Sequence, residues 1–115
     1  MQGYYSSGLP FLRVRMGSQN IESLLDTGFN GELLLSVKRI KELNLRRLGF
    51  AEYITADGSV MDSEIFSAEI EWFSALREVS VLSSPSNFAL LGMGLLQDVK
   101  TVLEPSKNVL VLSNQ

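Results

Sequence analysis

Short strand-like segments separated by turn residues follow one another along this chain and constrain its fold more than any other feature. The clearest pair, residues 51–56 and 60–70, is joined at Asp57 and Gly58. Asp-Gly between strand-like segments is a strong signal for a tight β-hairpin. Apolar and charged residues also alternate over residues 12–16, turn residues follow at 17–20, and a second strand is expected at 21–26. Hairpins are therefore the predicted building unit.

One short amphipathic helix interrupts this pattern. Ser36 is a good N-cap residue, and apolar side chains recur at helical spacing over residues 37–45. Arg46 and Arg47 would then lie at the solvated end of this helix, where positive charge is favourable.

The remaining segments complete the predicted architecture. Residues 72–75 would form a corner before a strand at 76–82, and residues 102–104 and 109–112 would form a terminal hairpin around Pro105. We expect an all-β fold, closed or sandwich-like, with one or two short helices. At 115 residues the chain is expected to be a single domain, 1–115, with residues 1–8 as a terminal arm.

Composition narrows the possible chemistry. Histidine and cysteine are absent, which excludes Ser-His and Cys-His nucleophile pairs, disulfides and the commonest zinc sites. A net charge of -3 with dispersed basic residues argues against nucleic acid, and no apolar run is long enough to cross a membrane. A chain without cysteine or an apolar leading segment is most simply cytoplasmic, although lack of cysteine is compatible with export. Carboxylates are the natural remaining general acids and bases.

One carboxylate occupies a distinctive position. Residues 24–28 are Leu-Leu-Asp-Thr-Gly, so that Asp26 follows a short apolar run and precedes a hydroxyl and a glycine. Such a segment predicts a buried strand ending in a tight turn. The same three residues also occur as an ordinary strand-end turn, in which the aspartate only accepts hydrogen bonds from the following backbone.

Three elements, taken in order, resemble retropepsin-like aspartic peptidases, especially their small stand-alone microbial members. Residues 24–35 are similar to the active-site segment of that family, and residues 89–94, Ala-Leu-Leu-Gly-Met-Gly, are similar to its late apolar-apolar-glycine element. The hairpin at Asp57 and Gly58 lies between them, where the family has its flap. The resemblance implies a closed acid-protease-type β-barrel with a flap hairpin.

The resemblance also implies a reaction. An enzyme of this family holds two carboxylates against one water molecule, and one chain of this length supplies only Asp26. The implied protein is therefore an aspartic endopeptidase that acts as a homodimer, with an extended peptide or protein as substrate and with no metal or organic cofactor.

Other residues receive roles from the same resemblance. Thr27 would reach across the dimer to the partner's backbone, and Gly28 would leave its carbonyl open to a bound peptide. Leu90 and Leu91 would pack behind the Asp26 turn, and Gly92 would permit close backbone contact there. Asp57 and Gly58 would form the flap tip.

Phe29 departs from the family pattern. Most members have Ala or Ser at this position, and a serine there often donates a hydrogen bond to the catalytic carboxylate, which a phenyl ring cannot do. Two interpretations stay open: either Phe29 weakens the orientation of the dyad, or it faces inward as part of the core. Phe29 also favours the alternative function, a non-catalytic peptide-binding or dimerisation module on the same fold.

Overall fold

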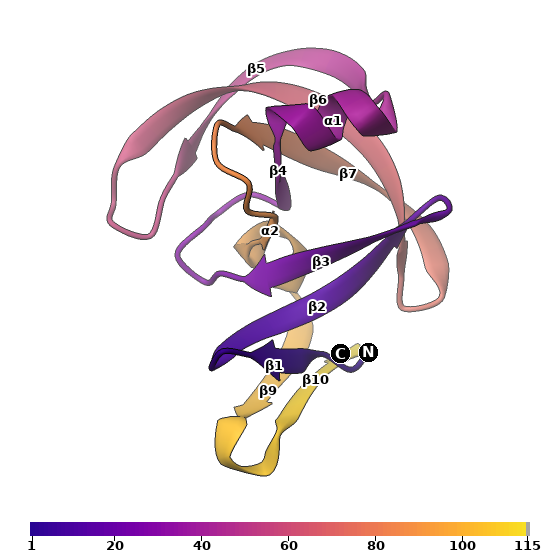
Figure 1. The fold of residues 1–115 in the computed structure, drawn as a ribbon, viewed down its shortest axis with the longest axis vertical. Helices are drawn as coiled ribbons and strands as arrows, with labels where there is room; N and C mark the ends of the chain where they lie inside the picture. Colours follow the sequence, from indigo (N-terminus) through magenta and orange to yellow (C-terminus); the bar gives the residue numbers. More distant parts are fainter. Residues whose placement is uncertain (115) are drawn as a thin grey trace.

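A curved eight-stranded sheet forms most of the computed structural model, which describes residues 1–114 (Figure 1). A separate two-stranded sheet carries the end of the chain, and two short α-helices connect strands. The elements in chain order are β1 (Tyr4–Ser6), β2 (Leu9–Met16), β3 (Gln19–Leu25), β4 (Leu33–Ser36), α1 (Val37–Leu43), β5 (Arg46–Ile54), β6 (Val60–Trp72), β7 (Ala75–Ser84), β8 (Leu90–Leu91), α2 (Met93–Leu96), β9 (Val99–Glu104), a 3-10 turn (Pro105–Lys107) and β10 (Val109–Asn114).

The large sheet is open, so the prediction of a closed barrel is wrong. Its strand order is β1-β2-β3-β8-β4-β7-β6-β5, and within the described residues β1 and β5 are two edges that do not pair. A barrel closes only when its first and last strands exchange hydrogen bonds. Here β1 has three residues and pairs with β2, while β5 lies at the far end of a long hairpin. The sheet instead curls until β2 packs against β6 (Figure 1).

The curl encloses one main hydrophobic core. Alternate residues of β2 and β3 point inward, including Leu12, Val14 and Ile21, and they meet inward-facing residues of β6 and β7 such as Ile70 and Val81. Each of these side chains is at most 3 % exposed. The period-two pattern in the sequence therefore corresponds to one buried face and one solvated face.

Helix α1 begins as predicted but ends earlier. The Ser36 hydroxyl accepts a hydrogen bond from the Arg39 N–H at 3.1 Å, which satisfies an otherwise unpaired donor of the first turn. Asn44 adopts the left-handed conformation and ends the helix. Arg46 and Arg47 are therefore not a helix end, as predicted, but the first residues of β5. Strand pairing explains the difference, because β5 pairs along β6 as far as Arg46.

The predicted hairpins are present. β2 and β3 pair in continuous register. β5 and β6 pair with one shift of register, between Arg47 and Gly49. β9 and β10 form the terminal hairpin at one end of the molecule (Figure 1). The N-terminal residues lie along β10, where Gly3 N–H donates to the Leu110 carbonyl at 2.8 Å and Leu112 N–H donates to the Met1 carbonyl at 2.8 Å. Residues 1–3 and β10 thus lie side by side.

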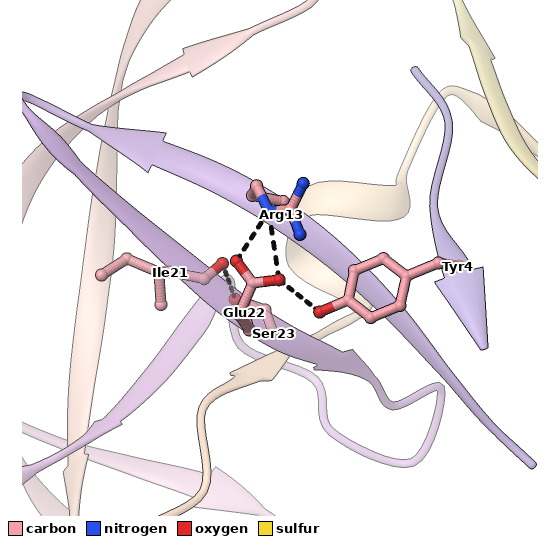
Figure 2. Close-up of polar contacts among 5 residues, drawn as sticks. All are labelled: Tyr4, Arg13, Ile21, Glu22 and Ser23. Atoms are coloured by element: carbon pink, nitrogen blue, oxygen red, sulfur yellow. Dashed lines mark hydrogen bonds and ion pairs between the residues drawn. The ribbon is translucent and has the colours of Figure 1, made fainter. Parts of the chain in front are cut away.

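A cluster of polar side chains on the outer face of the sheet ties β1, the edge strand, to β2 and β3. The Tyr4 hydroxyl and the Arg13 guanidinium both donate to the Glu22 carboxylate, the latter at 2.9 Å (Figure 2). The hydrogen bond from Arg13 lowers the pKa of Glu22, whereas desolvation and the bond to Glu22 raise the pKa of Tyr4. Residues 4–6 of the predicted terminal arm are thus an ordered edge strand.

Candidate functional site

The Asp26 loop, residues 26–32, connects two strands that are not neighbours. β3 leads into it and β4 leaves it, while β8 lies between them, parallel to β3 and antiparallel to β4. Leu90 pairs with Leu24, and Leu91 pairs with Leu25. This arrangement brings the late apolar pair directly beside the end of the strand that carries Asp26.

The backbone and side chain of Asp26 are both fixed. Its N–H donates to the Leu91 carbonyl at 2.9 Å, and its Oδ1 accepts a hydrogen bond from the Gly28 N–H at 2.9 Å. The Asp26 side chain is half-buried, whereas Thr27 and Gly28 are exposed. The turn therefore presents a carboxylate at the surface on a backbone tied to the sheet.

Residues 92–94 clamp the second half of the loop. Gly92 N–H donates to the Glu32 carbonyl at 3.0 Å, and Met93 N–H donates to the Phe29 carbonyl at 2.8 Å. A Cβ on Gly92 would collide with the Gly31 carbonyl oxygen and would lie 2.6 Å from that of Phe29. Only glycine allows the two backbones to approach this closely.

Phe29 faces inward. It is 1 % exposed and forms a second, smaller core with Leu34, Tyr53 and Leu82. Its ring meets that of Tyr53 edge to face, with centroids 5.7 Å apart and an interplanar angle of 87°. Of the two interpretations left open by the sequence, the inward-facing one is the observed geometry.

The β5–β6 hairpin carries the flap tip, residues 55–59, over the Asp26 loop. Asp57 lies at the turn and accepts hydrogen bonds from the Thr55 hydroxyl at 2.6 Å and from the Ser59 N–H at 2.9 Å. The bond from Thr55, assisted by that from Ser59, lowers the pKa of Asp57 to about 2. The Gly58 N–H donates to the Thr55 carbonyl at 2.9 Å, which closes the turn.

Besides the Phe29–Tyr53 ring pair, two further contacts connect the flap hairpin to the loop. An ideal Cβ on Gly28 would lie 2.7 Å from both Cα and Cβ of Ala56, so these backbones touch. The Ile54 N–H donates to Asn30 Oδ1 at 3.1 Å. Asp57 and Gly58 form the turn itself, but Ala56 is the residue that meets the loop.

Sequence reasoning placed Ala56 beside the flap turn without its contact to the loop, and it gave no role to Asn30 or Tyr53. The inward direction of Tyr53 follows from the alternation along β5, in which Phe50 is 76 % exposed and Tyr53 is 6 % exposed. No comparable signal marks Ala56 or Asn30, because their contacts depend on how two distant segments meet.

The loop borders a space large enough for a side chain. A cavity of about 280 Å³ lies beside it, lined by residues of the loop, β5, β6 and β7 that include Asn30, Glu32, Tyr53 and Leu82. Glu32 at its edge accepts hydrogen bonds from Arg77 at 3.0 Å and from the Ser80 N–H at 2.8 Å. Among residues 1–114 no three acidic side chains are grouped so as to hold a metal ion.

Within residues 1–114, neither helix is long and apolar enough to cross a membrane.

Solved structures with the same fold are retropepsin-like. A retropepsin-like aspartic protease from Rickettsia conorii matches with a TM-score of 0.72 and 18 % identity, over 99 % of this chain and 89 % of that one. A foamy viral protease-reverse transcriptase, solved with an RNA/DNA hybrid, matches with a TM-score of 0.60 and 18 % identity, over 84 % of this chain and 13 % of that one. No family model matches the sequence, and neither does any curated protein. The resemblance stated from the motifs is thus confirmed at the level of the fold.

Proposed function

We propose that this chain is an aspartic endopeptidase that acts as a homodimer, with one Asp26 from each subunit at the catalytic centre. The observation that carries the proposal is the Asp26 loop itself. Its carboxylate sits at the end of β3, and its backbone is hydrogen-bonded to Leu91 and to the residues after it, in a fold shared with retropepsin-like proteases. A backbone fixed in this way suits a carboxylate that must be held in a defined position relative to a substrate.

The chemistry follows from pairing two such carboxylates. Like charges about 3 Å apart cannot both ionise easily, so that the pair shares one proton and offers a base and an acid together. The ionised Asp26 would take a proton from the attacking water, and the protonated Asp26 would polarise the peptide carbonyl. Proton transfer to the leaving amine would complete hydrolysis without a covalent intermediate. The apparent pKa values would belong to the pair.

Residues around Asp26 support this arrangement. Thr27 is exposed and available to a partner subunit. Gly28 has no side chain, so its backbone would become accessible to a peptide once Ala56 moves away from it. An extended peptide would bind as an added β-strand between the loop and the flap hairpin, with one side chain in the 280 Å³ cavity. Closure of the flap tip over it would exclude water.

The second subunit would use the small sheet. In the described part of the chain β9 pairs on one side only, with β10. Its open edge carries Leu103, which is 44 % exposed. An unpaired strand edge of this kind readily adds a strand from another chain.

The decisive experiment replaces the carboxylate. Asp26→Asn should abolish cleavage of an unfolded protein library between acidic and neutral pH, because an amide cannot share the proton of the dyad. Asp98→Asn, the same chemical change at an exposed turn residue, is the matched control and should retain activity. Sedimentation should show a dimer for all three proteins. Identical cleavage patterns for wild type and Asp26→Asn across this pH range would refute the proposal.

The alternative is a non-catalytic module that binds an extended segment with the same cleft. Phe29 favours it, since its buried ring supplies no hydroxyl to orient Asp26. On this alternative wild type and Asp26→Asn both fail to cleave and bind the same peptides with equal affinity.

A further inference from the structure

The flap tip occupies the place where a peptide would have to lie. The Gly28 and Ala56 backbones are in contact, as the 2.7 Å separation from an ideal Gly28 Cβ shows. A strand hydrogen-bonded to both segments would hold them roughly 9.5 Å apart, twice the usual strand spacing of about 4.8 Å. In this subunit the flap tip therefore already touches the Asp26 loop at Gly28, on the side where such a strand would have to enter.

Two side chains that leave this loop hold the β5 arm down next to the tip. The Asn30 carboxamide oxygen accepts the Ile54 N–H at 3.1 Å, at the last residue before the tip. The Phe29 ring packs edge to face on Tyr53, the residue before that. Both rings are buried, at 1 % and 6 % exposure, and the contact therefore excludes water.

These anchors differ from the contacts inside the tip. The bonds from Thr55 and Ser59 to Asp57 shape the turn but end within it, so that they would move with it as a unit. The Phe29 and Asn30 contacts join two separate parts of the chain, and these must change for the tip to lift.

We propose that Phe29 and Asn30 are positioning residues that latch the flap hairpin over the Asp26 loop and set how often the site opens. Access of a peptide is then governed by an equilibrium between a latched and a lifted hairpin, and the apparent affinity for the peptide is reduced by the fraction that is latched. The control of peptide access rests on the proposed function. The effect of Phe29 and Asn30 on opening of the hairpin does not.

Hydrogen exchange followed by mass spectrometry or NMR tests the latch without any cleavage assay. Asn30→Ala should speed exchange of amides 53–59 about five-fold, as expected for the loss of one neutral hydrogen bond. Phe29→Leu, which keeps an apolar side chain in the core, should speed it further. Amides of β9 and β10 should exchange at the wild-type rate in both variants.

Two controls match these changes. Asn87→Ala removes a carboxamide from an exposed loop residue, and Phe11→Leu removes the stacked pair of Phe11 with Tyr4 at the other edge of the sheet. Neither should alter exchange at 53–59. Wild-type exchange there in Asn30→Ala, or an equal acceleration over the whole chain, would overturn the proposal. If Phe29→Leu fails to fold, Asn30→Ala decides alone. A catalytically inert wild type would refute the peptidase while leaving the exchange result unaffected.

Discussion

The Asp26 loop and the flap tip touch each other, yet they are held in opposite ways. The loop is bonded through its backbone to residues 91–94, and Phe29 anchors it in a buried cluster. The flap tip is exposed, and most of its hydrogen bonds connect tip residues to one another. The loop is therefore the more firmly held of the two, and the flap tip is tied to it chiefly through the neighbouring residues Tyr53 and Ile54.

The largest effect on stability is expected from a methyl group added at Gly92, where residues 92–94 contact the Asp26 loop. Gly92→Ala should destabilise the protein by about 1–3 kcal/mol, toward the upper end, because the clash is with the backbone of residues 29 and 31. Urea denaturation measures the change. At Gly94 the nearest atoms lie at 2.9–3.0 Å from an ideal Cβ, so Gly94→Ala should cost less. Equal stability of Gly92→Ala and wild type would show that the clamp is not tight.

A smaller and local effect is expected in the flap tip. Asp57→Ala removes the acceptor of the bonds from Thr55 and Ser59, and the Ser59 amide should therefore lose protection. Global stability should stay close to that of the wild type, because the turn at Asp57 is solvent-exposed. Amide exchange measures the local loss of protection at Ser59, and urea denaturation measures the global stability. Asp62→Ala, on the adjacent β6, is the control, and a large loss of global stability in Asp57→Ala would contradict the comparison.

The smallest effect concerns pH. The folded pKa of Asp57, about 2, lies below its ordinary value of 3.8, so its contribution is fully present above the ordinary value and is lost as the pH falls through about 2. The tip should therefore stay ordered at the mildly acidic pH that suits an aspartate dyad. An NMR titration of the Asp57 carboxyl carbon should give a midpoint near 2; a midpoint near 4 would show that the bonds from Thr55 and Ser59 do not persist in solution.

Local chemistry predicted much of this architecture. The Asp57-Gly58 hairpin, the Ser36 cap and the terminal hairpin each depend on neighbouring residues, and each is present. The closed barrel was wrong because pairing of β1 with β5 is a property of distant strands, which no local pattern specifies. Arg46 and Arg47 were misplaced for a related reason, since pairing with β6 outweighs the tendency to extend the helix.

In the candidate site, too, features that depend on neighbouring residues could be predicted, whereas features that depend on distant segments could not. The motifs identified Asp26 and the Leu90-Leu91-Gly92 element, and the structure brings these together through the pairing of β8 with β3. The direction of Phe29 could not be decided from the sequence, because it depends on the space between the loop and Tyr53. Roles in catalysis for Asp26, Thr27 and Gly28 stay predictions.

The position of β8 also has a consequence for biosynthesis. β3 and β4 are synthesised first, and the strand that joins them, at residues 90–91, follows only after β5, β6 and β7. Contacts between such distant segments form late and slowly. The Asp26 loop therefore acquires its final shape only after residues 90–94 have left the ribosome, and a growing polypeptide that stops short of them carries no finished loop.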